Sequence, residues 1–172
     1  GQIRMKAIIY TSNTGSTAEY AQLLGNELNL PVHSLQQAKN KVPAGSEIIY
    51  LGWIMAGGIK GYKEAAKLYK VRAVCGVGMG QTGTQLKEVR DKNAIPQRIP
   101  LFTLQGNFDV KKLHGVYRFM MNVMVKTAGK GLANKIDRTP EEDDMLDMMV
   151  NGGKRVSLQN LNAVTEWYKS VY

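Results

Sequence analysis

The sequence has 172 residues, which favours a single domain, and 44% of them are hydrophobic, enough for a buried core and too many for a wholly disordered chain. It contains no run of 18 apolar residues, so we expect no membrane-spanning helix. A single cysteine, Cys75, excludes an internal disulfide and a zinc site built from cysteines. Its isolation favours a reducing, cytoplasmic location.

The net charge is +9, and it is unevenly distributed along the chain. Residues 1–140 hold 20 basic and eight acidic side chains, whereas acidic residues cluster in 141–147. A basic surface suits nucleic acid, an anionic membrane or an acidic protein. A nucleic-acid-binding protein would need aromatic residues interleaved with lysine and arginine on an exposed strand or groove. That pattern is missing from the sequence, so a nucleic-acid-binding module is only an alternative and no nucleic acid is expected.

Short apolar runs alternate with helix-like segments from residue 5 to residue 106, which predicts an α/β protein with a parallel sheet covered on both faces. Strands are expected at 5–10, 31–35, 47–51, 71–77 and 100–104. Helices are expected from residue 17 to 28, from 62 to 69 and from 86 to 93. Ligands of such sheets bind at the carboxyl ends of the strands.

The pattern changes after residue 106. Residues 113–126 form a methionine-rich helical pattern with a wide apolar face. Thr139, followed by proline and then by Glu142, predicts a helix start with a capping box. The acidic run 141–147 is expected on a solvated helix face. Ser157 is expected to cap a closing helix with a core stripe of Leu158, Leu161, Val164, Trp167 and Val171.

The strongest chemical signal lies between the first strand and the first helix. Small hydroxyl residues and one glycine let the backbone wrap around an anion, with the helix dipole behind it. The loop contains no lysine and lacks the pattern of a nucleoside-triphosphate loop, so a single phosphate is the expected ligand. The alternative is a hydroxyl-rich turn that only begins the helix. The candidate residues are Thr11, Ser12, Asn13, Thr14, Gly15, Ser16 and Thr17.

Here the sequence resembles the flavodoxin family, over about residues 5–106. The matching positions are Ile8, Ile9, Tyr10, Ser12, Gly15, Thr17 and Ala21. The resemblance implies a flavodoxin-like three-layer α/β/α fold, with a five-stranded parallel sheet of order 2-1-3-4-5 and a helical C-terminal extension. It also implies flavin mononucleotide (FMN), with the phosphate held by Ser12 to Thr17. We expect one flavodoxin-like domain over 1–172. Its parts are a core at 5–106, a helical insertion or extension at 107–156 and a closing helix at 157–172.

The resemblance also implies roles for the loops after the third and fourth strands. Trp53 or Met55 could stack on the flavin ring, and Gly57 with Gly58 could let a peptide turn its carbonyl toward flavin N5. The loop after the fourth strand lacks the tyrosine that flavodoxins often place there. The alternatives are an ordinary glycine-rich connection and a dinucleotide loop, although the glycine spacing from Gly76 does not fit the latter. The ring-side candidates are Trp53, Ile54, Met55, Ala56, Gly57, Gly58, Gly78, Met79, Gly80, Gln81 and Thr82. Residues 105–107 either border the site or only turn the chain.

These observations predict an FMN-dependent electron carrier or oxidoreductase without a metal site, whose partner is a redox protein or a quinone. Residues 113–126 also resemble a segment of menaquinone-dependent protoporphyrinogen oxidases. The alternative function is therefore a quinone-coupled flavin oxidoreductase peripheral to the inner face of the membrane. Its basic, methionine-rich helix would contact anionic lipid, unless that helix belongs to the core. A flavin-free scaffold is the remaining alternative.

Overall fold

A computed structural model describes residues 4–109, 131 and 133–172. Its sheet has the strand order β2-β1-β3-β5-β6, and every neighbouring pair on this path is parallel. A short strand, β4 (Gly58–Ile59), pairs antiparallel with the end of β3. The other strands are β1 (Ala7–Thr11), β2 (Val32–Ser34), β3 (Glu47–Met55), β5 (Lys70–Gly78) and β6 (Leu101–Gln105).

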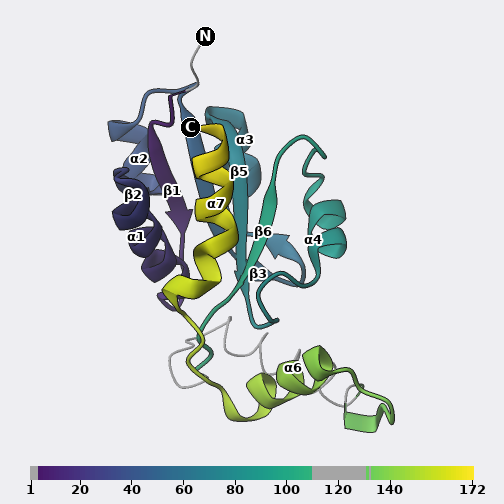
Figure 1. Cartoon of the computed structure of the whole chain (residues 1–172). Coiled ribbons are helices and arrows are strands. Elements are labelled where there is room, and N and C mark those ends of the chain that lie inside the picture. The colour runs from purple at the N-terminus through teal and green to yellow at the C-terminus, as the bar shows by residue number, and fades with distance from the viewer. Residues whose placement is uncertain (1–3, 110–130, 132) are drawn as a thin grey trace.

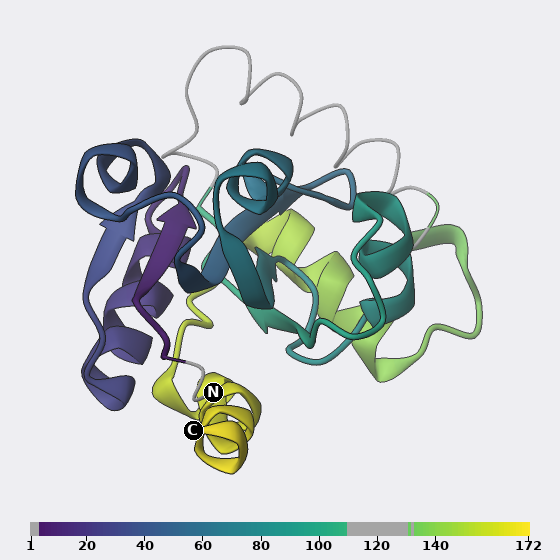
Figure 2. The ribbon, with the colours of Figure 1, turned by 90° about the horizontal axis from the view of Figure 1, so that it is seen from above.

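Helices cover both faces of the sheet, as Figures 1 and 2 show. One face packs against α1 (Ser16–Leu28), the short 3-10 helix η2 (Leu158–Leu161) and α7 (Asn162–Val171). The other packs against α2 (Leu35–Lys41), α3 (Tyr62–Leu68) and α4 (Leu86–Asn93). A further helix, α6 (Pro140–Asn151), lies beyond the carboxyl ends of the strands (Figure 1).

Alternating strand residues supply the two cores. Ile8, Ile49 and Cys75 are fully buried on the α1 and α7 face, whereas Ile9 and Tyr50 are fully buried on the opposite face. Burial on both faces explains why the strands are almost continuously apolar. The predicted α/β class is confirmed, and the five parallel strands have the predicted order. The architecture is consistent with a flavodoxin-like three-layer fold.

The sheet has a topological switch point beside β1. This strand lies between β2 and β3, so the chain leaves it toward one edge of the sheet and then returns to build the other half. Loops that follow the strands on either side of such a point diverge and leave a crevice at the carboxyl edge. The loops after β1 and β3 meet this condition.

The third strand is longer than predicted, and the helix after β2 was not predicted. β3 continues through Gly52 to Met55, so Trp53, Ile54 and Met55 belong to a strand and not to a loop. A Cβ at Gly52 would lie 2.5 Å from the Lys60 carbonyl oxygen, so glycine is needed where the chain folds back. Leu35, predicted to be in a strand, begins α2, and Ser34 caps this helix.

The C-terminal helices agree with the sequence pattern in the capping box of α6 and differ from it elsewhere, because Ser157 caps η2 and no side chain among the described residues caps α7. α6 begins with the predicted capping box, because Thr139 Oγ1 accepts from the Glu142 amide at 3.2 Å and the Glu142 carboxylate accepts from the Thr139 amide at 3.3 Å. In the closing segment, Leu158 and Val171 are 45% and 48% exposed, so their assignment to the core was wrong.

The predicted helix at 113–126 lies outside the described residues. Across the part of the chain that the structure describes, none of the helices has the length and apolar character needed to cross a membrane.

Candidate functional site

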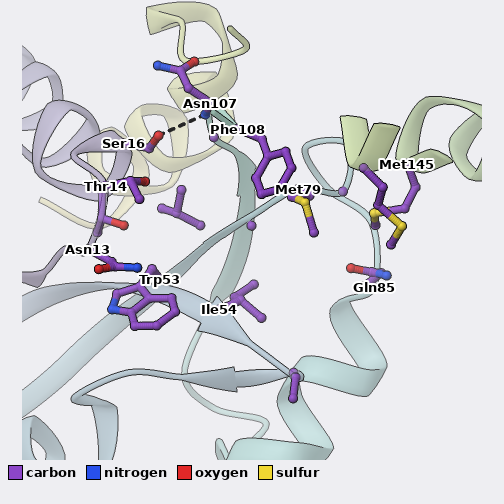
Figure 3. Close-up of a pocket in the computed structure, with 18 residues that line it drawn as sticks. Asn13, Thr14, Ser16, Trp53, Ile54, Met79, Gln85, Asn107, Phe108 and Met145 are labelled. Carbon is purple, nitrogen blue, oxygen red and sulfur yellow. Dashed lines mark hydrogen bonds between the residues drawn. The ribbon is translucent and has the colours of Figure 1, made fainter. Parts of the chain in front are cut away.

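A cavity of about 260 Å³ opens at the switch point (Figure 3). The ends of β3 and β5 and the segments that follow β1, β3, β5 and β6 build its walls, and α6 contributes a further wall. The lining residues are Asn13, Thr14, Ser16, Thr17, Trp53, Ile54, Ala56, Gly57, Val77, Gly78, Met79, Gly80, Gln85, Gly106, Asn107, Phe108, Met145 and Met149.

The loop after β1 presents unpaired donors at the start of α1. Gly15 is the N-cap residue just before α1 and has a φ of 108°. No side chain of the described residues caps this helix, and the amides of its first turn have no intrahelical partners. Among the described residues, the side chains of Asn13, Thr14 and Thr17 have no hydrogen-bond partner, although Thr17 is only 1% exposed. Amides and hydroxyls at the positive end of a helix dipole suit an anion such as a phosphate.

The candidate residues of this loop divide between two cavities. Thr11, Ser12 and Gly15 line a second cavity of about 700 Å³, on the side of β2 and α2, and Asn13 borders both cavities. The Ser12 hydroxyl oxygen is buried and has no partner among the described residues. Thr11 is already engaged, because Tyr50 Oη lies 2.8 Å from its Oγ1.

The loop after β6 is anchored to α1. The Asn107 amide donates to Ser16 Oγ at 2.9 Å, the contact marked in Figure 3. A Cβ at Gly106 would lie 3.0 Å from Ser16 Cβ, so glycine allows this close approach. Asn107 Oδ1 accepts from the amides of Arg155 and Val156 at 2.6 and 2.9 Å. Residues 106 and 107 therefore border the cavity and also fix the returning C-terminal chain.

A tight hairpin forms the wall after β3. Ala56 and Gly57 have φ values of 50° and 82° and connect Met55 to Gly58, the geometry of a two-residue turn. Trp53, Ile54, Ala56 and Gly57 line the cavity, whereas Met55 and Gly58 do not.

Two contacts of this hairpin involve Asn93 and Lys60, neither of which lines the cavity. The Gly57 carbonyl accepts from Asn93 Nδ2 at 2.9 Å. Lys60 Nζ lies 5.6 Å from the centre of the Trp53 ring, within the range of a cation–π contact. The side-chain amide of Asn93 and the ammonium of Lys60 therefore contact this wall from outside the cavity lining.

The loop after β5 lines the cavity with its first part and with Gln85, the residue just before α4. Gly78, Met79 and Gly80 line it, while Gln81 and Thr82 hold the loop to itself and to β6. Thr82 Oγ1 accepts from the Gln105 amide at 2.9 Å, and the Gln81 carbonyl accepts from Thr84 Oγ1 at 2.6 Å.

The wall provided by α6 was not predicted. Met145 and Met149, one helical turn apart, face the cavity with Phe108. Asp144 Oδ2 accepts from Gln105 Nε2 at 2.6 Å, and its other oxygen lies 3.5 Å from Arg155. The Asp144 side chain is only 19% exposed, so the acidic run is not entirely solvated as predicted. In the sequence, this wall was indicated by the spacing of Met145 and Met149, four residues apart in an otherwise acidic helix.

The cavity has a neutral lining. None of the described residues that line it carries an ionisable side chain. Within the described residues there is also no group of three or more histidine, cysteine, aspartate or glutamate side chains able to hold a metal ion. The cavity therefore offers anion-binding donors at one end and apolar, aromatic and backbone groups elsewhere. It suits a ligand with a phosphate and a planar apolar part.

Comparisons with protein-family models, curated proteins and solved structures find no match for this chain. Any functional assignment therefore depends on the residues of the site itself.

Proposed function

We propose that this chain is a flavodoxin-like redox protein that binds FMN in the switch-point cavity and transfers electrons through it. One observation carries the proposal. The unpaired donors at the start of α1 open onto the same cavity as Trp53 and the glycine-containing segments after β3 and β5.

The phosphate would be held by neutral groups. Amides of residues 13–17 and the hydroxyls of Thr14 and Thr17 are free to donate, and the N-terminus of a 13-residue helix supports a negative charge. The Ser12 hydroxyl, buried and unpaired among the described residues, belongs to the same loop but lines the second cavity, so it is not assigned to this phosphate site.

The ring would lie among apolar side chains and backbone groups. Trp53, Met79 and Phe108 provide flat or adaptable apolar surface, and glycines at 57, 78 and 80 expose backbone amides and carbonyls. When bound, FMN supplies the electron-accepting group, and the protein binds it, orients it and limits its access to water. The methionines of α6 serve this last purpose.

The electron partner is a redox protein or a quinone, and the proposed location is the cytoplasm. Flavodoxin shuttles are usually acidic, and this chain carries a charge of +9. An acidic protein partner therefore complements it. The segment that would favour quinone chemistry at a membrane, residues 113–126, lies outside the described residues.

The test is the visible spectrum of the purified chain after incubation with FMN and desalting. We expect flavin bands that stay with the protein, and weaker retention of riboflavin, which lacks the phosphate. Thr14→Glu places a negative charge in the exposed part of the loop and should weaken FMN binding at least about tenfold, equivalent to about 1.4 kcal/mol.

Gln22→Glu is the matched control, because it adds the same charge on an exposed position of α1 away from both cavities. It should retain FMN like the wild type. A colourless wild-type protein would overturn the proposal. Equal retention of FMN by Thr14→Glu and the wild type would contradict the part of the proposal that places the phosphate in the loop after β1.

A further inference from the structure

The second cavity, of about 700 Å³, lies on the β2 and α2 side of the loop after β1. Its volume is in the usual range for small-molecule sites. Its lining contains hydroxyl and amide side chains and, unlike that of the switch-point cavity, two charged ones. These polar side chains belong to Ser12, Asn13, Ser34, Gln36, Lys39 and Glu64. The lining suits a ligand with many hydrogen-bonding groups.

Two groups of this lining are available to a ligand. The Ser12 hydroxyl oxygen is buried without a hydrogen-bond partner among the described residues, and a buried hydroxyl is normally satisfied by a protein group, a ligand or water. Lys39 Nζ lies 2.6 Å from Glu64 Oε1, but both side chains are about half exposed, and such ion pairs contribute little. A phosphate can therefore replace Glu64 as the partner of the Lys39 ammonium.

The two cavities meet at the start of α1. Asn13 lines both, Thr14 lines the switch-point cavity and Gly15 lines the second. A phosphate at this helix N-terminus can therefore carry substituents in two directions, toward β3 and β5 or toward the end of β2. In parallel sheets that bind dinucleotides, the pyrophosphate lies at such a terminus, and a side chain about 20 residues further along the chain binds the ribose. Ser34, the last residue of β2, has about this separation from Gly15 and lines the second cavity.

We propose that the second cavity holds the adenylate half of a dinucleotide, so that this chain binds flavin adenine dinucleotide (FAD) more tightly than FMN. The inference rests on the proposed function, because FAD is FMN joined to adenosine monophosphate through a pyrophosphate. The switch-point cavity and the start of α1 keep the roles already proposed for them. Ser12 and Ser34 provide hydroxyls for the adenylate half, and Lys39 balances the charge of its phosphate.

The test compares the dissociation constants of FAD and FMN for the same protein by isothermal titration calorimetry. The wild type should bind FAD at least about tenfold more tightly than FMN. Ala18→Trp should abolish this preference and leave FMN binding unchanged, because Ala18 lines only the second cavity and a tryptophan there fills space that the adenylate half needs. Ala163→Trp is the matched control, since Ala163 is an exposed alanine at the start of α7 outside both cavities. It should keep the preference.

A charge reversal tests the same cavity without added bulk and replaces Ala18→Trp if that variant does not fold. Lys39→Glu puts a second carboxylate beside Glu64 and should lower the preference for FAD at least about fivefold, because like charges repel the added phosphate. Lys41→Glu makes the same change in the same turn of α2, outside both cavities, and should not lower it. Equal affinities of the wild type for FAD and FMN, or an unchanged preference in either cavity variant, would overturn the inference while FMN binding stands. Failure of the wild type to bind either flavin would overturn both.

Discussion

Asn107 shows how much one side chain contributes to this site. Its Oδ1 accepts from two consecutive backbone amides, those of Arg155 and Val156, and its own amide donates to Ser16. The residue thus joins the end of β6, the start of α1 and the chain that returns toward α7. Since Ser16 lies in the first turn of α1, these contacts also hold the free amides of that turn in place.

Replacement of Asn107 by alanine should therefore affect both stability and binding. Two part-buried amides would lose their acceptor, and we expect a loss of about 2 kcal/mol in the free energy of unfolding, measured in urea. FMN retention should fall as well. Asn151→Ala is the control, because Asn151 is exposed and donates only to the exposed Asp147 among the described residues. A change in stability of the same size in both variants would contradict the role assigned to Asn107.

At the scale of elements, α6 depends on local signals for its stability. It contributes only Met148 and Met149 as buried residues. Its first turn is held by the capping box of Thr139 and Glu142, by the negative residues that complement the helix dipole, and by a contact of 2.7 Å between Lys135 and Glu142. This contact is exposed, so we expect it to contribute little.

Thr139→Ala should consequently loosen the wall of the cavity without unfolding the sheet. Loss of the cap should cost about 1 kcal/mol of helix stability. Hydrogen exchange at the amides of Glu142 and Asp143 should become faster, while exchange in β1 and β3 stays unchanged. Thr165→Ala makes the same substitution in α7 and should not affect α6. Uniformly faster exchange in the Thr139 variant would show that α6 is not a separate unit.

The order of the sheet could be predicted because each parallel strand is a short apolar run separated from the next by polar residues. Two details could not. Gly52 resembles a strand end in the sequence, yet it lies within β3 because the returning chain approaches it closely. Helix α2 has only Leu35 and Ala38 as buried residues, too few to produce a helical hydrophobic pattern.

The site could be predicted in outline only. Loops at the carboxyl ends of parallel strands converge, so Thr14, Trp53 and Met79 were placed together by topology alone. Asn93 and Met145 come from helices distant in sequence from those loops, and their part in the site follows from tertiary packing. The capping box predicts that α6 is a helix, but the sequence does not indicate that this helix lies over the cavity.

At the scale of the whole molecule, burial of titratable groups makes the free energy of unfolding depend on pH in the alkaline range. Burial raises the pKa of the Cys75 thiol to about 12, from an ordinary value of 9.0, and also raises the pKa of the Tyr50 hydroxyl. In the unfolded chain these groups lose their protons at ordinary pKa values. Between about pH 9 and pH 12 the folded state therefore retains protons that the unfolded state has released.

Stability should consequently change little between about pH 7 and pH 9 and should fall as the pH rises from about 9 toward 12. Each proton retained only by the folded state costs about 1.4 kcal/mol of stability per pH unit. The measurement is urea unfolding at about pH 7, pH 9 and pH 10.5. Cys75→Ala removes one of the titrating groups, so its stability should fall less steeply above pH 9, even though the variant is less stable at pH 7. Parallel pH profiles for the variant and the wild type would mean that the thiolate is tolerated within the sheet, against the burial of Cys75 between β3 and β6.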